Sequence, residues 1–224
     1  MKKIPFLLDG AMGTELNKRG VKTELPLWTA EANILHPNLV QNIHSEYIHS
    51  GADYITTNTF RSTSWTYKRA GYNNNKAKTM AKKSLYAGVK CAQAASKGVV
   101  KIAGSITTLD DCYNPKNYPG RKTAINVYKQ TLDWLIDAKV DVLLFETMGN
   151  LEEIEIALFL SQEHRKPIWL SVIMKDSKTI LDGTYFEKIV SLAKQYSVQT
   201  LLLNCNEISK TAHAIEVLHQ FWDG

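Results

Sequence analysis

The sequence predicts an α/β fold in which strands and helices alternate along the chain. Short apolar runs alternate with longer amphipathic stretches, and polar or glycine-containing turns flank each run. The chain has 224 residues, 44% of them hydrophobic, which is enough for one large α/β domain. No linker or internal repeat divides it, so we expect a single domain over residues 1–224 with a parallel sheet.

Six apolar runs are the predicted strands. Parallel strands need a long crossover between them, usually a helix, and the stretches between the runs suit this role. Such alternation is typical of a (β/α) barrel and also of a doubly wound sheet, and alone it does not separate the two. The runs are Ile4–Leu8, Tyr54–Thr57, Val99–Ala103, Val140–Phe145, Ile168–Ile173 and Thr200–Leu203.

Local signals place helices between these runs. Pro37 stands at a predicted first turn, where its missing N–H costs little, and Gly51 suits the end of that helix. Residues 76–95 are rich in Ala and Lys, and they favour a helix. Asn150 is a good N-cap for a third helix. The acidic residues after it, Glu153 among them, also favour a helix start because they lie at the positive end of the helix dipole.

The composition excludes several classes of function. The 27 basic and 22 acidic residues are spread along the chain, so no basic cluster indicates a nucleic-acid or membrane partner. Three widely spaced cysteines, Cys91, Cys112 and Cys205, favour free thiols in a reducing cytoplasm over a disulfide framework. Asp9 interrupts the first apolar run too early for a signal peptide, and no apolar stretch is long enough to span a bilayer.

Two segments interrupt the alternation of apolar runs and amphipathic stretches, and each follows a predicted strand. They are residues 61–75 and residues 108–122, the latter rich in Asp, Asn, Pro and Gly. In a (β/α) barrel the loops after the strands form the catalytic face, and in a doubly wound sheet they line the ligand crevice. We therefore expect the functional site on this side of the sheet.

Polar residues also collect at the ends of predicted strands, at Asp9, Asn58, Ser105, Glu146 and Cys205. A carboxylate can pair with a substrate amine, N–H groups of a glycine-containing turn can hold a carboxylate, and a thiolate can bind a soft metal. Each residue also has a simpler explanation, such as a turn at Asp9, caps at Asn58 and Ser105, and a small buried apolar residue at Cys205. Together they suit an amino acid that carries sulfur.

Longer strings of sequence carry a resemblance to a known family. Residues 7–16, Leu-Leu-Asp-Gly-Ala-Met-Gly-Thr-Glu-Leu, and residues 51–60, Gly-Ala-Asp-Tyr-Ile-Thr-Thr-Asn-Thr-Phe, are similar to the first two strand motifs of the homocysteine-binding domain. That domain is shared by the homocysteine S-methyltransferases, the betaine enzyme and the first module of cobalamin-dependent methionine synthase. The resemblance covers nearly the whole chain in order. Further matching strings are Leu27–Ala30, Ala103–Ser105, Leu144–Met148 and Asn204–Asn206.

The resemblance implies a TIM-type (β/α)8 barrel, of which this sequence holds about six units. It also implies Zn²⁺ and transfer of a methyl group to the thiol of homocysteine to give methionine. Zinc lowers the pKa of a bound thiol, which is ordinarily near 8.5, so that the sulfur can attack a methyl donor. Carried over by position, Asp9 and Glu146 bind the ammonium group, and both are the expected catalytic residues. By the same match, the backbone of Gly10, Ala11 and Met12 holds the carboxylate, Asn58 and Thr59 line the pocket, and Cys205 is a zinc ligand.

The sequence departs from the family at the zinc site. The family's other two ligands are a Cys-Cys pair in a Gly-Gly-Cys-Cys turn after the eighth strand, and this sequence stops just past its sixth predicted strand. Cys112 follows the third strand and can reach the catalytic face, whereas Cys91 falls in a predicted helix outside the barrel. Three explanations stay open: a fragment of a longer protein, a barrel completed by a second chain in a homo-oligomer, or a homologue that keeps the amino-acid pocket without catalysis.

Further residues bear on the identity of the methyl donor. The loop after the third strand lacks the Gly-Pro turn of many members, and Arg61 stands where the betaine enzyme has a tyrosine, which disfavours betaine. The resemblance favours S-methylmethionine or a related sulfonium compound, because the sequence has no folate or cobalamin module. A doubly wound domain is the competing fold, but the glycines of residues 9–14 do not follow the G-x-G-x-x-G spacing.

Overall fold

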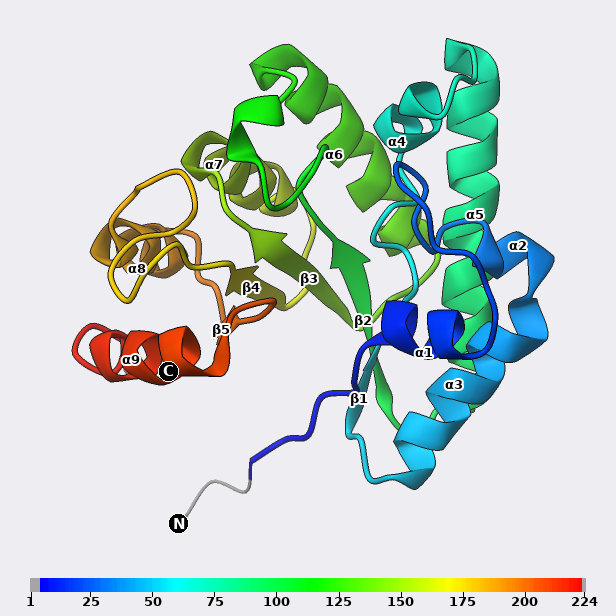
Figure 1. The fold of residues 1–224 in the computed structure, drawn as a ribbon, viewed down its shortest axis with the longest axis horizontal. Helices are drawn as coiled ribbons and strands as arrows, with labels where there is room; N and C mark the ends of the chain where they lie inside the picture. The colour runs from blue at the N-terminus through cyan, green and yellow to red at the C-terminus, as the bar shows by residue number, and fades with distance from the viewer. Residues whose placement is uncertain (1–4, 223–224) are drawn as a thin grey trace. The chain divides into compact units, whose positions relative to one another are not determined.

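The structure is a computed structural model that describes residues 5–222. Strands and helices alternate along the chain, as Figure 1 shows in the order of its colours. The chain forms two compact units, which are described in turn. The first contains the chain up to Ser105 together with Asp133–Val142, and the second contains Ile106–Leu132 and the chain from Leu143 onward.

Two parallel strands form the sheet of the first unit. β1 (Tyr54–Thr56) pairs with β2 (Lys101–Ile106), with Tyr54 opposite Lys101. Ahead of β1, Leu8 makes a single parallel bridge to Tyr54, so the predicted strand Ile4–Leu8 is wrong in extent, and Ile4 lies outside the described residues. The pairing is short because the chain turns into the first helix four residues after Leu8, at Met12.

The predicted strands that begin at Val99 and Val140 also start too early. Val99 belongs to the turn after a helix, where its N–H donates to the carbonyl of Ser96 at 2.8 Å. The N–H of Val140 likewise closes a helix end by donating to the carbonyl of Leu135 at 3.3 Å. β2 and β3 (Val142–Met148) therefore begin two residues later and run further, which places Ser105 and Glu146 inside strands rather than beyond them.

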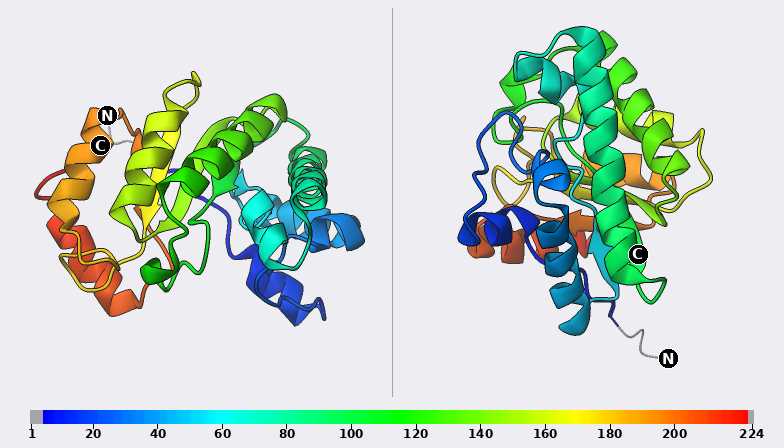
Figure 2. Two further views of the ribbon diagram at one scale, coloured as in Figure 1. Left: turned by 90° about the horizontal axis from the view of Figure 1, so that it is seen from above. Right: turned by 90° about the vertical axis from the view of Figure 1, so that its right-hand side faces the viewer.

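Helices surround these strands in the first unit. The longest is α5, and it packs against α3, as both views of Figure 2 show. The segment 61–75, expected to be irregular, contains the short helix α4, which begins where the Thr63 side chain accepts a hydrogen bond from the N–H of Thr66 at 3.1 Å. The bounds are α1 (Met12–Lys18), α2 (Ala32–Leu35), α3 (Pro37–His49), α4 (Ser64–Arg69) and α5 (Asn74–Ser96).

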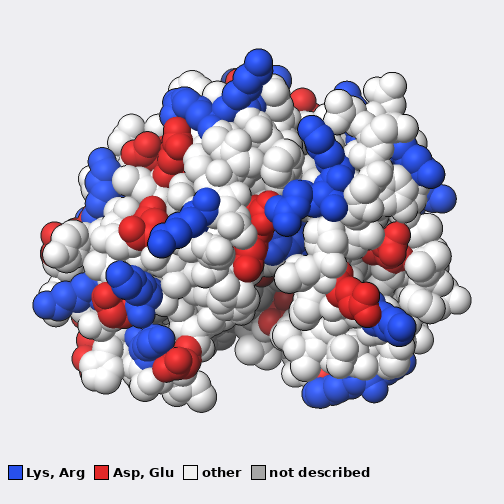
Figure 3. All heavy atoms as spheres, turned by 45° about the horizontal axis from the view of Figure 1, so that its top comes forward, with Lys and Arg blue, Asp and Glu red and all other residues white. Residues whose placement is uncertain are grey.

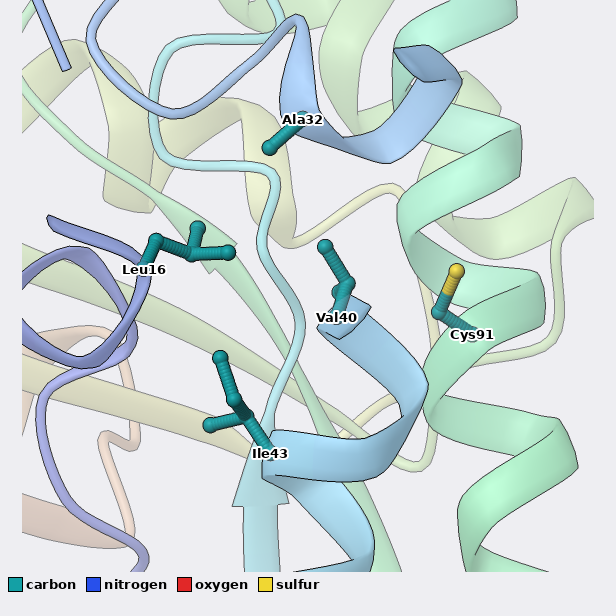
Figure 4. Packing of buried hydrophobic residues seen from close by; sticks show 5 residues of the cluster. All are labelled: Leu16, Ala32, Val40, Ile43 and Cys91. Carbon is teal, nitrogen blue, oxygen red and sulfur yellow. The ribbon is translucent and has the colours of Figure 1, made fainter. Parts of the chain in front are cut away.

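An apolar cluster joins four of these helices (Figure 4). Its members come from α1, α2, α3 and α5, and all are at most 6% exposed. Burial raises the pKa of the Cys91 thiol, which lies 3.4 Å from the carbonyl oxygen of Pro37. Cys91 is thus a packing residue of α5, as its predicted helical position indicated. The buried members are Leu16, Ala32, Val40, Ile43 and Cys91.

The second unit carries three parallel strands. β4 (Ile168–Val172) pairs with β3 on one side and with β5 (Thr200–Leu203) on the other. The predicted cap at Asn150 is confirmed, since its side chain accepts a hydrogen bond from the N–H of Glu153 at 3.0 Å. The other elements are η1 (Pro115–Asn117), α6 (Arg121–Asp137), which belongs to both units, α7 (Leu151–Ser161), α8 (Phe186–Gln195) and α9 (Ile208–Leu218).

The charged residues are dispersed. On the face drawn in Figure 3, Lys and Arg alternate with Asp and Glu, and no single sign covers a large area. Among the described helices, none combines the length and the apolar character needed to cross a membrane. The mixed charges on this face agree with the absence of a basic cluster in the sequence.

His44 is an unusual member of the core of the first unit. It lies in α3 with 0% of its surface exposed, and neither ring nitrogen has a hydrogen-bond partner among the described residues. Burial lowers the pKa of His44 from 6.5 to about 4. The imidazole therefore stays neutral in the folded chain at pH values where an exposed histidine takes up a proton.

We predict that acid destabilises the chain partly through His44. Between pH 6.5 and about pH 4 the unfolded chain binds a proton that the folded chain does not, so the free energy of unfolding falls as the pH falls, by about 3 kcal/mol in total. In a His44→Leu variant this part of the pH dependence should be lost, whereas His49→Leu, on the exposed side of the same helix, should retain it. Urea unfolding at pH 7 and pH 4.5 measures the difference, and an unchanged pH dependence in His44→Leu would contradict the prediction.

Candidate functional site

Asp9 is held at the carboxyl end of β1. Its Oδ2 accepts a hydrogen bond from the N–H of Thr56 at 2.8 Å, and its own N–H donates to the carbonyl of Tyr54 at 3.0 Å. The carboxylate is half-buried and marks the point where the chain leaves the sheet. The structure thus places Asp9 at a strand end, as the sequence predicts.

The turn after Asp9 packs on an aromatic ring. A Cβ atom at Gly10 would lie 2.7 Å from the ring of Tyr47, so only glycine allows this approach. The Tyr47 hydroxyl donates to the carbonyl of Ala11 at 3.3 Å. Helix α1 then begins at Met12 without a side-chain cap, which leaves the N–H groups of its first turn directed outward. This geometry agrees with a carboxylate held by the backbone of residues 10–12, which stays a prediction.

Asn58 follows β1 and is tied to two residues of the first unit. Its Oδ1 accepts from the Thr29 hydroxyl at 2.6 Å, and its Nδ2 donates to the carbonyl of Thr29 at 3.1 Å and to Oδ1 of Asn33 at 2.8 Å. Asn33 in turn donates to the carbonyl of Asn58 at 2.6 Å. With 4% of its surface exposed, Asn58 holds the loop after β1 against these neighbours. Its place in the substrate pocket stays a prediction.

Thr59 links the ends of β1 and β2. Its hydroxyl donates to the carbonyl of Ser105 at 2.7 Å and lies 2.7 Å from the hydroxyl of Thr57. The Thr57 hydroxyl accepts from the N–H of Ser105 at 3.0 Å. These side chains continue the strand pairing beyond the backbone ladder, and all three are buried. Thr59 therefore shapes the strand ends, whereas its predicted role in lining the pocket stays a prediction.

In the second unit, Glu146 lies beside an irregularity of β3. The register with β4 shifts between Phe145 and Met148, and Thr147 adopts a left-handed conformation with φ of 58°. Irregularities of this kind change the direction of side chains and are frequent next to functional sites. Glu146 is half-buried, so its carboxylate is neither sealed in the core nor fully in solvent.

Cys205 lies just after β5, in a network of polar side chains. It is exposed and also left-handed, with φ of 56°. Its sulfur is 3.6 Å from the Thr147 hydroxyl and from Nδ2 of Asn204. Asn204 also donates to the Thr147 hydroxyl at 2.8 Å and accepts from the N–H of Thr147 at 3.1 Å and the hydroxyl of Ser171 at 2.9 Å. The alternative that Cys205 is a small buried residue is thus wrong.

Sequence reasoning missed the surroundings of two residues of the second unit, Tyr113 and Glu153. Tyr113 belongs to the segment after β2 and lies close enough to the thiols of Cys205 and Cys112 for them to affect its pKa. The pKa of Tyr113 is raised to about 12, first by partial burial and then by negative charge at Cys205 and Cys112. Glu153, read from the sequence only as a dipole partner, is 2% exposed and accepts from the N–H of Leu109. Only a contact between residues far apart in sequence reveals either role.

The structure therefore brings the predicted residues together in two groups. Asp9, the turn at residues 10–12, Asn58 and Thr59 belong to the first unit, whereas Glu146 and Cys205 belong to the second. In the second group, Thr147 directly follows Glu146 and contacts the sulfur of Cys205. Each group lies at the carboxyl ends of strands, where (β/α) barrels carry their sites.

The thiol of Cys205 suits a soft metal such as zinc. Within residues 5–222, however, no group of three or more His, Cys, Asp or Glu side chains is arranged to hold a metal ion. Cys112 is buried, which makes it less accessible than Cys205. Cys205 therefore stays a predicted zinc ligand, and the described residues do not complete a metal site around it.

The alternating elements and the strand-end site define an α/β protein of the TIM-barrel type. The comparison with solved structures agrees: the oxidized form of the homocysteine methyltransferase MmuM from Escherichia coli matches 99% of this chain and 80% of its own, with a TM-score of 0.88 and 27% identity. The metallated form of the same enzyme matches 98% of this chain and 81% of its own, also with a TM-score of 0.88 and 27% identity.

Sequence comparisons give the family. The model of the homocysteine S-methyltransferase family matches residues 6–223. The homocysteine S-methyltransferase of Escherichia coli K12 is 30% identical over 227 residues, covering 96% of this chain and 73% of that protein. The selenocysteine methyltransferase of Astragalus bisulcatus is 25% identical over 228 residues, covering 89% of this chain and 68% of that protein.

The chain therefore belongs to the homocysteine S-methyltransferase family. This membership makes it a methyltransferase, with homocysteine as the methyl acceptor.

We predict that Asn58→Ala lowers the free energy of unfolding by about 3 kcal/mol. The substitution removes three side-chain hydrogen bonds, each worth roughly 1 kcal/mol, and leaves polar atoms of Thr29 and Asn33 without their partner. Asn17→Ala is the control, because Asn17 makes a 3.3 Å hydrogen bond on an exposed surface. Urea unfolding measures both variants, and similar small losses in the two would show that the Asn58 network is not important for stability.

Proposed function

We propose that this chain transfers a methyl group from a sulfonium donor to the sulfur of homocysteine and so forms methionine. The observation that carries the proposal is the exposed sulfur of Cys205 at the carboxyl end of β5, beside the irregular end of β3 where Glu146 lies. A sulfur ligand close to a strand end that carries a carboxylate suits a substrate with both a thiol and an ammonium group. Family membership supports the acceptor.

The proposed roles of the residues follow their positions. Asp9 and Glu146 attract the ammonium group of homocysteine by their negative charge. The backbone N–H groups of Gly10, Ala11 and Met12 bind its carboxylate, because no side chain caps this helix start. Asn58 and Thr59 support this region by fixing the loop after β1.

Zinc is proposed as the cofactor, with Cys205 as one ligand. A soft cation favours thiolate ligands, and a bound Zn²⁺ would lower the pKa of the homocysteine thiol toward neutrality. Support comes from the Escherichia coli relative, of which a metallated form has been solved. A complete site needs further ligands besides those of the described residues.

The transfer balances without an oxidant or a reductant. The bond from the methyl carbon to the donor sulfur breaks, and its electron pair stays on that sulfur, which becomes a neutral thioether. The homocysteine sulfur forms the new bond, and its proton passes to solvent.

A cytoplasmic location and a homo-oligomeric state remain predictions.

The test is methionine formation from homocysteine and S-methylmethionine, followed by mass spectrometry with zinc added. We expect turnover by the wild-type chain and a loss of at least about a hundredfold in Cys205→Ala, because the variant cannot bind the metal through sulfur. Binding of homocysteine without any turnover would favour the second candidate, a homologue that keeps the amino-acid pocket. The incomplete ligand set among the described residues is the observation behind that alternative.

We further predict that Asp9→Asn raises the KM for homocysteine by about tenfold or more. The amide oxygen can still accept the hydrogen bond from the N–H of Thr56, so the strand end is preserved while the charge is lost. A charge-assisted hydrogen bond is worth about 1.5–3 kcal/mol, and 1.4 kcal/mol corresponds to a factor of ten. Steady-state kinetics measure the KM, and thermal unfolding checks the fold. An unchanged KM would remove Asp9 from the ammonium site.

A further inference from the structure

Thr147 adopts an unfavourable backbone conformation near the end of β3. Its φ is 58°, in the left-handed region, although its side chain is branched at Cβ and 0% exposed. Residues branched at Cβ rarely adopt this conformation, because Cβ then comes close to a backbone carbonyl oxygen. Such strain persists only where the surrounding structure holds the residue in place, and it is concentrated at functional sites. The contacts of Thr147 therefore indicate why the chain keeps this conformation.

Asn204, just after β5, holds both polar groups of Thr147. Its Oδ1 accepts a hydrogen bond from the N–H of Thr147 at 3.1 Å, and its Nδ2 donates to the Thr147 hydroxyl at 2.8 Å. Asn204 is itself held by β4, because its Oδ1 accepts from the hydroxyl of Ser171 at 2.9 Å and its N–H donates to the carbonyl of Val172 at 3.3 Å. Groups from β4 and from the end of β5 thus fix the conformation of Thr147.

Thr147 connects the two residues of the second unit to which the proposed function gives a role. Its hydroxyl lies 3.6 Å from the sulfur of Cys205. Along the backbone, Thr147 directly follows Glu146, where the register of β3 with β4 shifts. Irregularities of this kind redirect the side chains around them. The side chain of Thr147 therefore meets the sulfur, while its backbone helps to set the direction of the Glu146 carboxylate.

We propose that Thr147 is a positioning residue for methyl transfer, whose strained backbone and hydroxyl hold the carboxylate of Glu146 and the sulfur of Cys205 in a fixed relation. The inference rests on the proposed function for the roles of Glu146 and Cys205. With 0% of its surface exposed, Thr147 does not contact the substrate and acts only through these two neighbours. A misplacement of about 1 Å in a site can lower a rate by about a hundredfold. Loss of the Thr147 contacts should therefore impair the reaction of homocysteine.

Two substitutions separate the hydroxyl of Thr147 from the shape of its side chain. Thr147→Ser keeps the hydroxyl and removes the methyl group. Thr147→Val keeps the branched shape and leaves Nδ2 of Asn204 without the hydroxyl that it binds. Thr131→Val is the matched control, because Thr131 is also buried in the second unit, while its hydroxyl donates to the carbonyl of Val127 in its own helix at 2.9 Å.

The first measurement is the rate at which iodoacetamide alkylates Cys205 in the metal-free protein, with the product assigned by peptide mapping. We expect Thr147→Val to change this rate about threefold or more, because the sulfur loses a polar contact that fixes its position. Thr147→Ser and Thr131→Val should react at nearly the wild-type rate. A wild-type rate in Thr147→Val would overturn the proposal, and so would an equal change in Thr131→Val, which would indicate a general loss of packing.

The second measurement adds Thr147→Gly, since glycine adopts the left-handed conformation without steric cost. We expect its urea midpoint to equal or exceed that of Thr147→Val, which keeps the strain. Its kcat/KM for homocysteine should nevertheless fall by about tenfold or more, because the contacts with the sulfur and with Asn204 are lost. Wild-type kinetics in folded Thr147→Gly would count against positioning. If the wild type gives no turnover, the proposed function fails, and the alkylation rates alone decide the inference.

Discussion

Parallel strand pairing is the constraint on which the arrangement of this molecule depends. In each unit the strands run in one direction, so their carboxyl ends, and the residues that follow them, lie at a common edge. Asp9 after the Leu8 bridge and Asn58 after β1 share such an edge in the first unit. Thr147 of β3 and Cys205 after β5 share one in the second. Chemistry-bearing residues distant in sequence thereby become neighbours.

Side chains extend the strand pairing where the backbone ladder stops. Asp9 accepts from the N–H of Thr56, and Thr57 accepts from the N–H of Ser105. In the second unit, Asn204 accepts from the N–H of Thr147. Each of these contacts satisfies a backbone group that would otherwise lack a partner in the sheet. The same polar residues that suit a substrate site therefore also stabilise the strand ends.

Much of the fold could be predicted from local sequence signals. The Asn150 cap, the long helix around residues 76–95 and the strand at Thr200–Leu203 depend on neighbouring residues, and the structure confirms them. The predicted strand start at Val99 and the predicted strand Ile4–Leu8 are wrong, because apolar character does not show where strand pairing begins and ends. The nearness of Tyr113 to Cys205 could not be found from the sequence, since only the fold brings the two residues together. The strand-end residues were predictable as a group, whereas their individual contacts were not.

The close packing of Gly10 on Tyr47 ties two positions of the chain to one another. Any side chain at position 10 must share the volume that the tyrosine ring occupies, since a Cβ there would lie 2.7 Å from the ring. A residue at 10 larger than glycine therefore requires the Tyr47 ring to move away or position 47 to become smaller. In natural variants or designed libraries the two positions should change together, because both determine the shape of the turn after Asp9.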